Sequence, residues 1–107
     1  MEPASDRPLL LFFTSERSGP GRRMESLLAH LARKERARLR VSRVYVERSP
    51  DLAGRLDVQE VPCLVLVDGG KALARLDGRA SAPRIERMLE AHLPAVLQGN
   101  PDRSVAA

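Results

Sequence analysis

The spacing of the apolar residues divides the chain into segments of different periodicity. Residues 9–13 form a continuous apolar run between Pro8 and the polar pair Thr14 and Ser15. Such a run is typical of a strand that is buried on both faces of a sheet. From Pro20 onward the apolar residues recur at helical spacing, which predicts a long amphipathic helix. Its apolar stripe comprises Met24, Leu27, Leu28, Leu31 and Ala32.

The middle of the chain predicts a strand, a short helix and a β-hairpin. Residues 39–47 are rich in valine and favour a strand. The Ser-Pro-Asp sequence at residues 49–51 is typical of a helix start, and a short helix is expected to follow it. Residues 61–67 predict a third strand with a proline near its beginning, where proline is tolerated. The Asp-Gly-Gly turn at residues 68–70 then leads into an antiparallel return strand over residues 72–76.

A last helix is expected after Ser81, which suits the N-cap position, with Pro83 in the first turn. Pro94 is expected to end this helix. One face of the helix is apolar and consists of Ile85, Met88, Leu89 and Leu93. Residues 1–93 are therefore predicted to form one domain, and residues 94–107 a flexible tail.

The predicted element order is β-α-β-α-β-β-α. A helix between the first two strands requires them to be parallel, with a right-handed crossover. The last two strands form a hairpin and are antiparallel. The sequence thus predicts an α/β domain built on a mixed, four-stranded central sheet with flanking helices.

Composition narrows the possible functions. The 107 residues include one cysteine and two histidines, which excludes an internal disulfide framework and a multi-cysteine metal site. No cofactor is expected. The start of the chain lacks a signal segment, and no apolar stretch approaches the roughly 18 residues of a membrane helix. We therefore expect a cytoplasmic protein without a membrane partner. The net charge is +4, and sixteen of the eighteen basic residues are arginine.

Several landmarks of the chain resemble those of the thioredoxin family. The Arg-Ser-Gly-Pro-Gly-Arg loop at residues 17–22 is similar to the family's Trp-Cys-Gly-Pro-Cys-Lys, and residues 61–63 are similar to its Ile-Pro-Thr loop. Residues 49–50, the glycine pair in the hairpin and Gly78 also match in position. The resemblance covers residues 9–93. It implies a trimmed thioredoxin fold, without the family's N-terminal strand and helix, and a cis peptide bond before Pro62.

The departures from the family pattern concern its chemistry. Ser18 and Gly21 occupy the positions of the two cysteines, Arg17 replaces the tryptophan, and Phe12 replaces a buried acid. Disulfide exchange needs one thiolate to attack and a second thiol to resolve the mixed disulfide. The sequence therefore excludes dithiol–disulfide exchange at this loop.

The favoured hypothesis is a redox-inactive binding or adaptor module for a protein or an extended peptide segment. The N–H groups at a helix start attract anions, and neighbouring arginines would strengthen that attraction. Main-chain pairing along the proline loop needs no thiol. The expected docking face comprises Arg17, Ser18, Gly19, Pro20, Gly21, Arg22, Arg23, Val61, Pro62 and Cys63.

Other interpretations remain open at this point. Cys63 is expected to be an inert, buried thiol, but close to the helix start its pKa could be lowered, giving a monothiol or glutathione-linked role. The basic stretch at residues 33–40 suggests nucleic-acid binding, but no aromatic residues interleave with it for base stacking, which argues against that interpretation. An edge strand without the family's N-terminal strand offers a surface for a homodimer.

Overall fold

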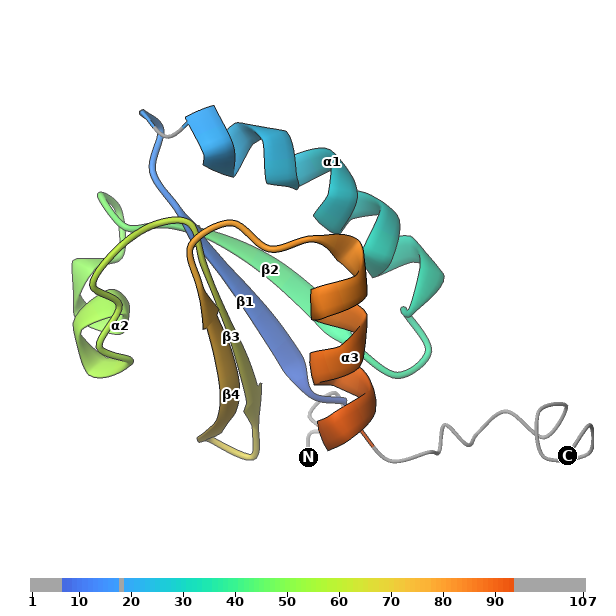
Figure 1. The fold of residues 1–107 in the computed structure, drawn as a ribbon. Helices are drawn as coiled ribbons and strands as arrows, with labels where there is room; N and C mark the ends of the chain where they lie inside the picture. The colour runs from blue at the N-terminus through green and yellow to red at the C-terminus, as the bar shows by residue number, and fades with distance from the viewer. Residues whose placement is uncertain (1–6, 18, 94–107) are drawn as a thin grey trace, which may run out of the picture.

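The computed structural model describes residues 7–17 and 19–93, and it confirms the predicted order of elements (Figure 1). The sheet has the strand order β2-β1-β3-β4. The elements are β1 (Leu9–Thr14), α1 (Gly19–Lys34), β2 (Arg40–Tyr45), α2 (Pro50–Arg55), β3 (Cys63–Asp68), β4 (Lys71–Asp77) and α3 (Ala82–His92). The predicted tail lies outside the described residues, as does Pro94. None of the helices within the described part has the length and apolar character to cross a membrane.

The strand pairings are those expected for a mixed sheet. β1 is parallel to β2 and antiparallel to β3, and β3 pairs with β4 in an antiparallel hairpin. Phe13 of β1 lies opposite Val44 of β2 on one side and Cys63 of β3 on the other. The end of β1 and the beginning of β3 therefore meet at the same edge of the fold.

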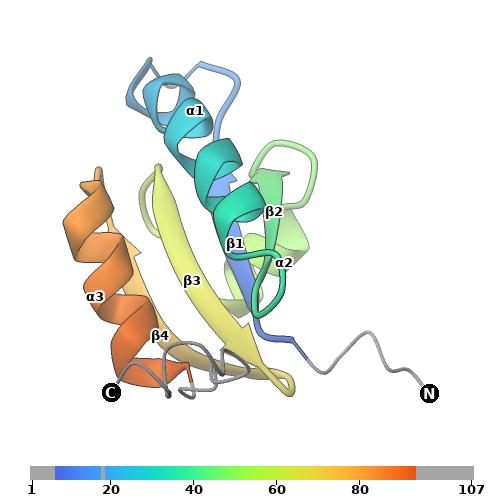
Figure 2. The ribbon, with the colours of Figure 1, turned by 90° about the vertical axis from the view of Figure 1, so that its right-hand side faces the viewer.

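Two apolar clusters hold the helices against the sheet. Leu10 and Phe12 belong to the cluster under α1 and α3, whereas Leu11 and Phe13 belong to the cluster under α2. Figures 1 and 2 show the corresponding layers, with α1 and α3 on one face of the sheet and α2 on the other. Successive side chains of a strand point to opposite faces, so a strand covered on both faces needs apolar residues at every position.

Turns and caps agree with the residue types that the sequence supplies. The Ser81 side chain accepts a hydrogen bond from the main-chain N–H of Arg84 at 3.4 Å and caps α3. Gly69 and Gly70 have φ values of 62° and 83° in the hairpin turn. Only glycine adopts this left-handed region without steric cost, so the glycine pair fixes the turn between β3 and β4.

Two predicted strands are shorter than expected. β2 ends at Tyr45, because the N–H groups of Arg48 and Ser49 both donate to the Tyr45 carbonyl oxygen and turn the chain. β3 begins at Cys63 instead of Val61. The Pro62 carbonyl accepts a hydrogen bond from the Gly78 N–H at 2.8 Å, beyond the end of the β3–β4 ladder.

One buried hydroxyl gives a stability prediction. The Thr14 side chain is 1% exposed, and its Oγ1 atom has no hydrogen-bond partner. Burying an unpaired polar group costs about 1–3 kcal/mol. We expect Thr14→Val to raise the free energy of unfolding by about 1 kcal/mol in urea denaturation. Thr14→Ser keeps the hydroxyl and serves as the control. A lower stability of the valine variant would show that the hydroxyl has a partner in solution.

Candidate functional site

The two loops that the sequence assigns to the docking face lie at the same end of the sheet. One loop connects β1 to α1 and contains Arg17, and the other precedes β3 and contains Val61. Their proximity follows from the pairing of Phe13 with Cys63, which brings the end of β1 beside the start of β3. Figure 1 shows both loops at the upper edge of the sheet.

The start of α1 carries positive charge. Gly19, Pro20 and Gly21 form the beginning of the helix, and Ser18 lies outside the described residues. The first turn contains no acidic residue. The arginines at 17, 22 and 23 are exposed, and Arg22 donates to the Glu16 carbonyl oxygen at 3.2 Å. None of the ion pairs formed within residues 7–17 and 19–93 involves these three side chains. The helix dipole adds to their potential, so this end of α1 is suited to an anionic group.

Four residues that the sequence analysis missed connect this loop to the segment after β2. The Ser15 hydroxyl donates to the Glu47 carboxylate, and Arg48 forms an ion pair with Glu16. The Ser15 Oγ also accepts a hydrogen bond from the Arg17 N–H at 3.1 Å. The partners are 32 residues apart in the chain, and no local pattern indicates them. They connect residues 15–17 to the segment after β2.

The pKa of Glu47 reports on this connection. The hydrogen bond from Ser15 is the main cause of the lowered pKa of Glu47. We expect Ser15→Ala to raise that pKa toward the ordinary value of 4.5, measured by NMR titration of the side-chain carboxyl group. The lowered pKa also makes the stability of the fold depend on pH. The hydrogen bond stabilises the folded state at pH values above the ordinary pKa of Glu47, and this stabilisation is lost as the pH falls through the lowered pKa. An unchanged pKa in Ser15→Ala would mean that the hydroxyl does not donate to Glu47.

The proline loop offers main-chain groups next to the positive helix start. The Val61–Pro62 peptide bond is cis, as the family resemblance implied. Pro62 is buried and Val61 is half-buried. Within the described part of the chain, no hydrogen bond engages the N–H or C=O of Val61. Val61 therefore offers a main-chain donor and an acceptor that no described residue engages.

Cys63 lies on the other face of the sheet from α1. Its side chain is fully buried in the cluster under α2, together with Phe13 and Ala53. The Sγ–H donates to Oδ1 of Asp77 at 3.3 Å, and Nη2 of Arg75 lies 3.8 Å from Sγ. Desolvation and the hydrogen bond to Asp77 raise the pKa of Cys63 to about 11, although the charge of Arg75 opposes them.

The position of Cys63 therefore agrees with an inert, buried thiol. The alternative interpretation requires a pKa lowered by the helix start, whereas desolvation and Asp77 raise the pKa of Cys63. A thiol with a pKa near 11 is almost entirely protonated at neutral pH, and the thiol form is a poor nucleophile. Among the predicted docking-face residues whose burial the structure describes, both Pro62 and Cys63 are buried.

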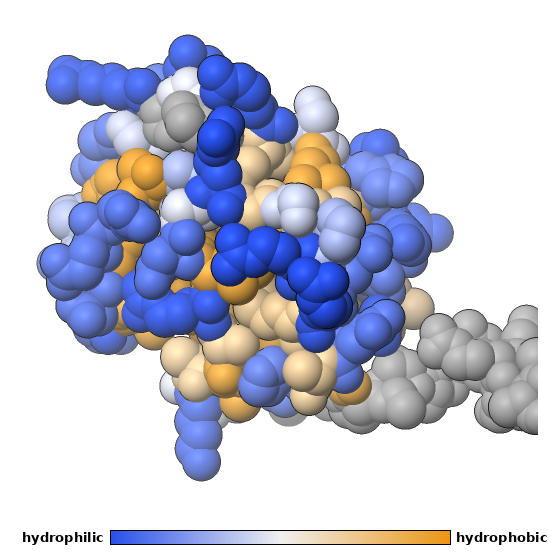
Figure 3. All heavy atoms as spheres, viewed as in Figure 1, coloured by the Kyte–Doolittle hydropathy of each residue, from blue (hydrophilic) through white to orange (hydrophobic). Residues whose placement is uncertain are grey.

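The remaining candidate residues form no further chemical cluster. Within residues 7–17 and 19–93, nowhere do three or more His, Cys, Asp or Glu residues come together as a potential metal site. In the basic stretch, Lys34 pairs with Glu86 at 3.3 Å and Arg38 with Glu35 at 2.5 Å. Phe12, at the position of the family's acid, is 1% exposed and packs in the apolar cluster under α1. Figure 3 shows mainly hydrophilic side chains on the face that it presents.

Comparisons with known proteins agree with the fold and the resemblance. A sequence model described as Thioredoxin matches residues 2–91. The chain is 29% identical over 93 residues to a thioredoxin of Alicyclobacillus acidocaldarius, covering 87% of this chain and 85% of that protein. It is 26% identical over 91 residues to a bifunctional thioredoxin reductase/thioredoxin of Mycobacterium leprae, covering 85% of this chain and 20% of that protein. The crystal structure of Deadhead, a germline-specific thioredoxin of Drosophila melanogaster, superposes with a TM-score of 0.77 at 28% identity, covering 83% and 84% of the two chains.

Proposed function

Because the chain belongs to the thioredoxin family and has a single cysteine, we propose that it is a binding or adaptor module without dithiol chemistry. An intramolecular disulfide requires two thiols, and the chain supplies one, buried on the side of the sheet away from α1. The module binds an extended segment of another protein across the α1 start and the proline loop.

The observation that carries this proposal is the unengaged main chain of Val61 beside an exposed cationic loop. An extended segment gains main-chain hydrogen bonds from Val61, as in strand addition to a sheet edge. The arginines at 17, 22 and 23 favour a carboxylate on that segment, because guanidinium groups bind carboxylates in a matched, bidentate geometry. Neither interaction needs a thiol, so both are compatible with Ser18 and Gly21 in the loop.

A binding experiment tests this docking face. The probe is S-carboxymethylated insulin B chain, an extended polypeptide without free thiols, added to isotope-labelled protein and followed by NMR. We expect amide shifts at Val61, Arg17 and Gly19, with affinity that falls roughly fivefold in Arg22→Ala, about 1 kcal/mol. Arg84→Ala removes an exposed arginine from α3 and is the control. Shifts that spare both loops would contradict the proposal.

An enzymatic assay tests the redox part separately. With a dithiol as electron donor, the protein is expected to leave insulin disulfides unreduced, because no second thiol can release a mixed disulfide. A conventional thioredoxin serves as the positive control for the assay. Catalytic turnover that depends on this protein would refute the proposal, and loss of that turnover in Cys63→Ala would assign it to the single thiol.

A further inference from the structure

β2 is an edge strand whose outer side has free hydrogen-bonding groups. The N–H groups of Arg40 and Val46 donate to carbonyls on the β1 side, at Pro8 and Thr14. Main-chain groups alternate along a strand, so those of Val41, Arg43 and Tyr45 point away from β1. The Tyr45 carbonyl is used by the turn after β2. Within the described part of the chain, no strand pairs with the N–H and C=O of Val41 and of Arg43 or with the N–H of Tyr45.

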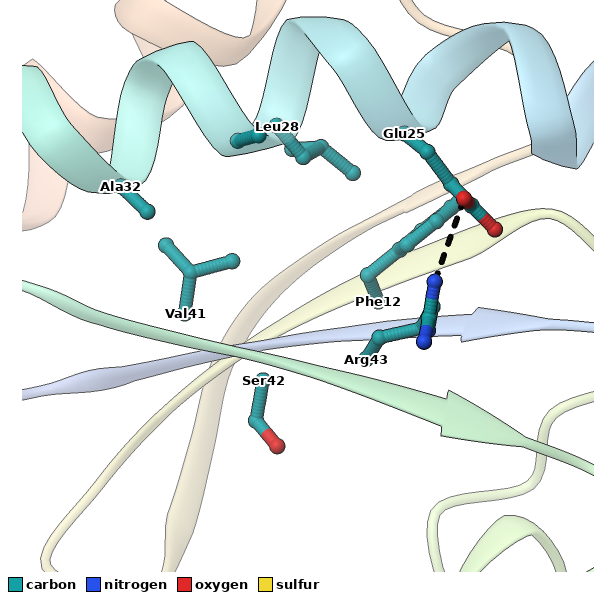
Figure 4. A pocket seen from close by; sticks show the side chains of 8 residues that line it. Phe12, Glu25, Leu28, Ala32, Val41, Ser42 and Arg43 are labelled. Carbon is teal, nitrogen blue, oxygen red and sulfur yellow. Dashed lines mark ion pairs between the residues drawn. The ribbon is translucent and has the colours of Figure 1, made fainter.

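An open groove lies between this edge and α1. It has a volume of about 440 Å³, and its lining includes Ala29 and Ala32 of α1 and Val41 of β2. In Figure 4 the Val41 side chain points toward α1 and Ala32, whereas Ser42 points away from the helix. At the far end of the groove, Arg43 pairs with Glu25 at 3.1 Å. The small residues leave room for apolar side chains of an added strand.

The beginning of β2 has an excess of positive charge. A neighbouring groove of about 460 Å³ shares Ala32 and Val41 and is also lined by three arginines, Arg7, Arg36 and Arg40. Arg7 donates to the Arg36 carbonyl, and Arg40 donates to the Arg7 carbonyl at 3.4 Å. The Nε of Arg40 is buried and has no hydrogen-bond partner. No ion pair within the described residues neutralises these three side chains.

We propose that the β2 edge binds an extended segment of a partner protein that alternates apolar and acidic residues, as a fifth strand of the sheet. Its apolar side chains occupy the groove beside Ala29, Ala32 and Val41. Its acidic side chains point to the opposite face, toward Arg40. This is a second docking surface, on another part of the molecule from the α1 start and the proline loop.

The charges favour such a partner over a second copy of the chain. In a symmetric antiparallel pairing of two β2 edges, side chains on the same face must oppose one another. With Arg43 on the symmetry axis, the two Arg43 side chains are directly opposed. With Ser42 on the axis, Arg40 of each copy lies opposite Val44, so the pairing supplies no acidic partner for Arg40. An acidic strand places carboxylates opposite this arginine, and opposite charges across a strand pair are stabilising.

The experiment uses the full chain and the capped peptide Ac-Asp-Val-Asp-Val-Asp-Val-NH2. A peptide with lysine in place of each aspartate is the control. We expect the acidic peptide to bind with a Kd of about 1 mM or tighter, and the lysine peptide at least tenfold more weakly. NMR hydrogen exchange is expected to slow at the amides of Val41, Arg43 and Tyr45, and to stay unchanged at Ser42 and Val44, which already face β1.

Two arginine variants separate a local contact from general charge attraction. Arg40→Glu is expected to lower the affinity for the acidic peptide at least tenfold and to raise the affinity for the lysine peptide. Arg55→Glu makes the same charge change on α2 and is expected to alter each affinity less than twofold. Arg40→Gln provides the test if the glutamate variant does not fold. Shifts at Val61 and Arg17 report the other docking face, so the two proposals can fail independently.

Three results would overturn this inference. They are the absence of binding by the acidic peptide, equal binding of both peptides, and binding without slower exchange at Val41 and Arg43. A dimer seen by sedimentation at rising protein concentration, with those amides already protected, would show that a second copy covers the edge instead.

Discussion

Alkylation of Cys63 by iodoacetamide at pH 8 is expected to be at least 100-fold slower in the folded protein than in the urea-unfolded chain. The pKa of Cys63 is raised from 9.0 to about 11 by desolvation and by the hydrogen bond to Asp77. Only the thiolate reacts, and a rise of two pKa units lowers its fraction about 100-fold at this pH. The side chain is also fully buried, which further slows the reaction. Mass spectrometry of quenched samples measures both rates.

Two neighbours of the thiol are expected to act in opposite directions. Asp77→Asn removes a carboxylate that raises the pKa of Cys63, so alkylation of the folded variant is expected to become faster. Arg75→Ala removes a cation that lowers this pKa, so alkylation is expected to become slower. Arg87→Ala, an exposed position on α3, is the matched control. If the folded protein reacts as fast as the unfolded chain, Cys63 is accessible and a monothiol role returns.

The raised pKa of Cys63 also makes the free energy of unfolding depend on pH. A thiol with a raised folded pKa keeps its proton longer in the folded state, so its contribution is complete below pH 9 and is lost between pH 9 and about 11. We expect the free energy of unfolding of the wild-type chain to fall by about 2–3 kcal/mol more than that of Cys63→Ala over that pH interval. Parallel denaturation curves of the two proteins across this interval would show that the thiol titrates at its ordinary pKa.

Substitution of Phe12 by alanine is expected to lower the free energy of unfolding by about 3–5 kcal/mol. Phe12 is 1% exposed and belongs to the cluster that holds α1 and α3 on the sheet. Its removal deletes a large buried side chain and leaves a cavity in that cluster. Because small domains have a total stability of about 5–15 kcal/mol, the variant approaches the limit of folding. Urea denaturation followed by circular dichroism measures the change.

A conservative variant controls for this experiment. Phe12→Leu fills most of the space and is expected to lose less than half as much stability. Met88 lies in the same cluster but is 8% exposed, so the stability loss of Met88→Ala is expected to lie between those of Phe12→Leu and Phe12→Ala. A loss below about 1 kcal/mol in Phe12→Ala would mean that the cluster repacks around the gap. Phe12 has no ionisable group, so it cannot do the acid–base chemistry of the buried acid that it replaces.

The candidate site could be predicted only in part. The loop around Gly19 and the loop around Pro62 carry local signals, because turn residues and a proline at a strand start have strong backbone preferences. The links from Ser15 to Glu47 and from Glu16 to Arg48 carry none, since each depends on how two distant loops pack. The direction of the Cys63 side chain also had no signal in a continuous apolar run, where both faces of the strand are apolar.

By itself, the sequence determined the order of the elements, the parallel pairing of β1 with β2, the antiparallel β3–β4 hairpin, and the absence of a second thiol. These follow from periodicity, turn chemistry and composition, which act over a few residues. Only the tertiary structure decided which face of the sheet covers Cys63, how Asp77 and Arg75 set its pKa, and that the outer side of β2 is open beside a groove. These properties depend on desolvation and on contacts between residues far apart in the chain, which no local pattern encodes.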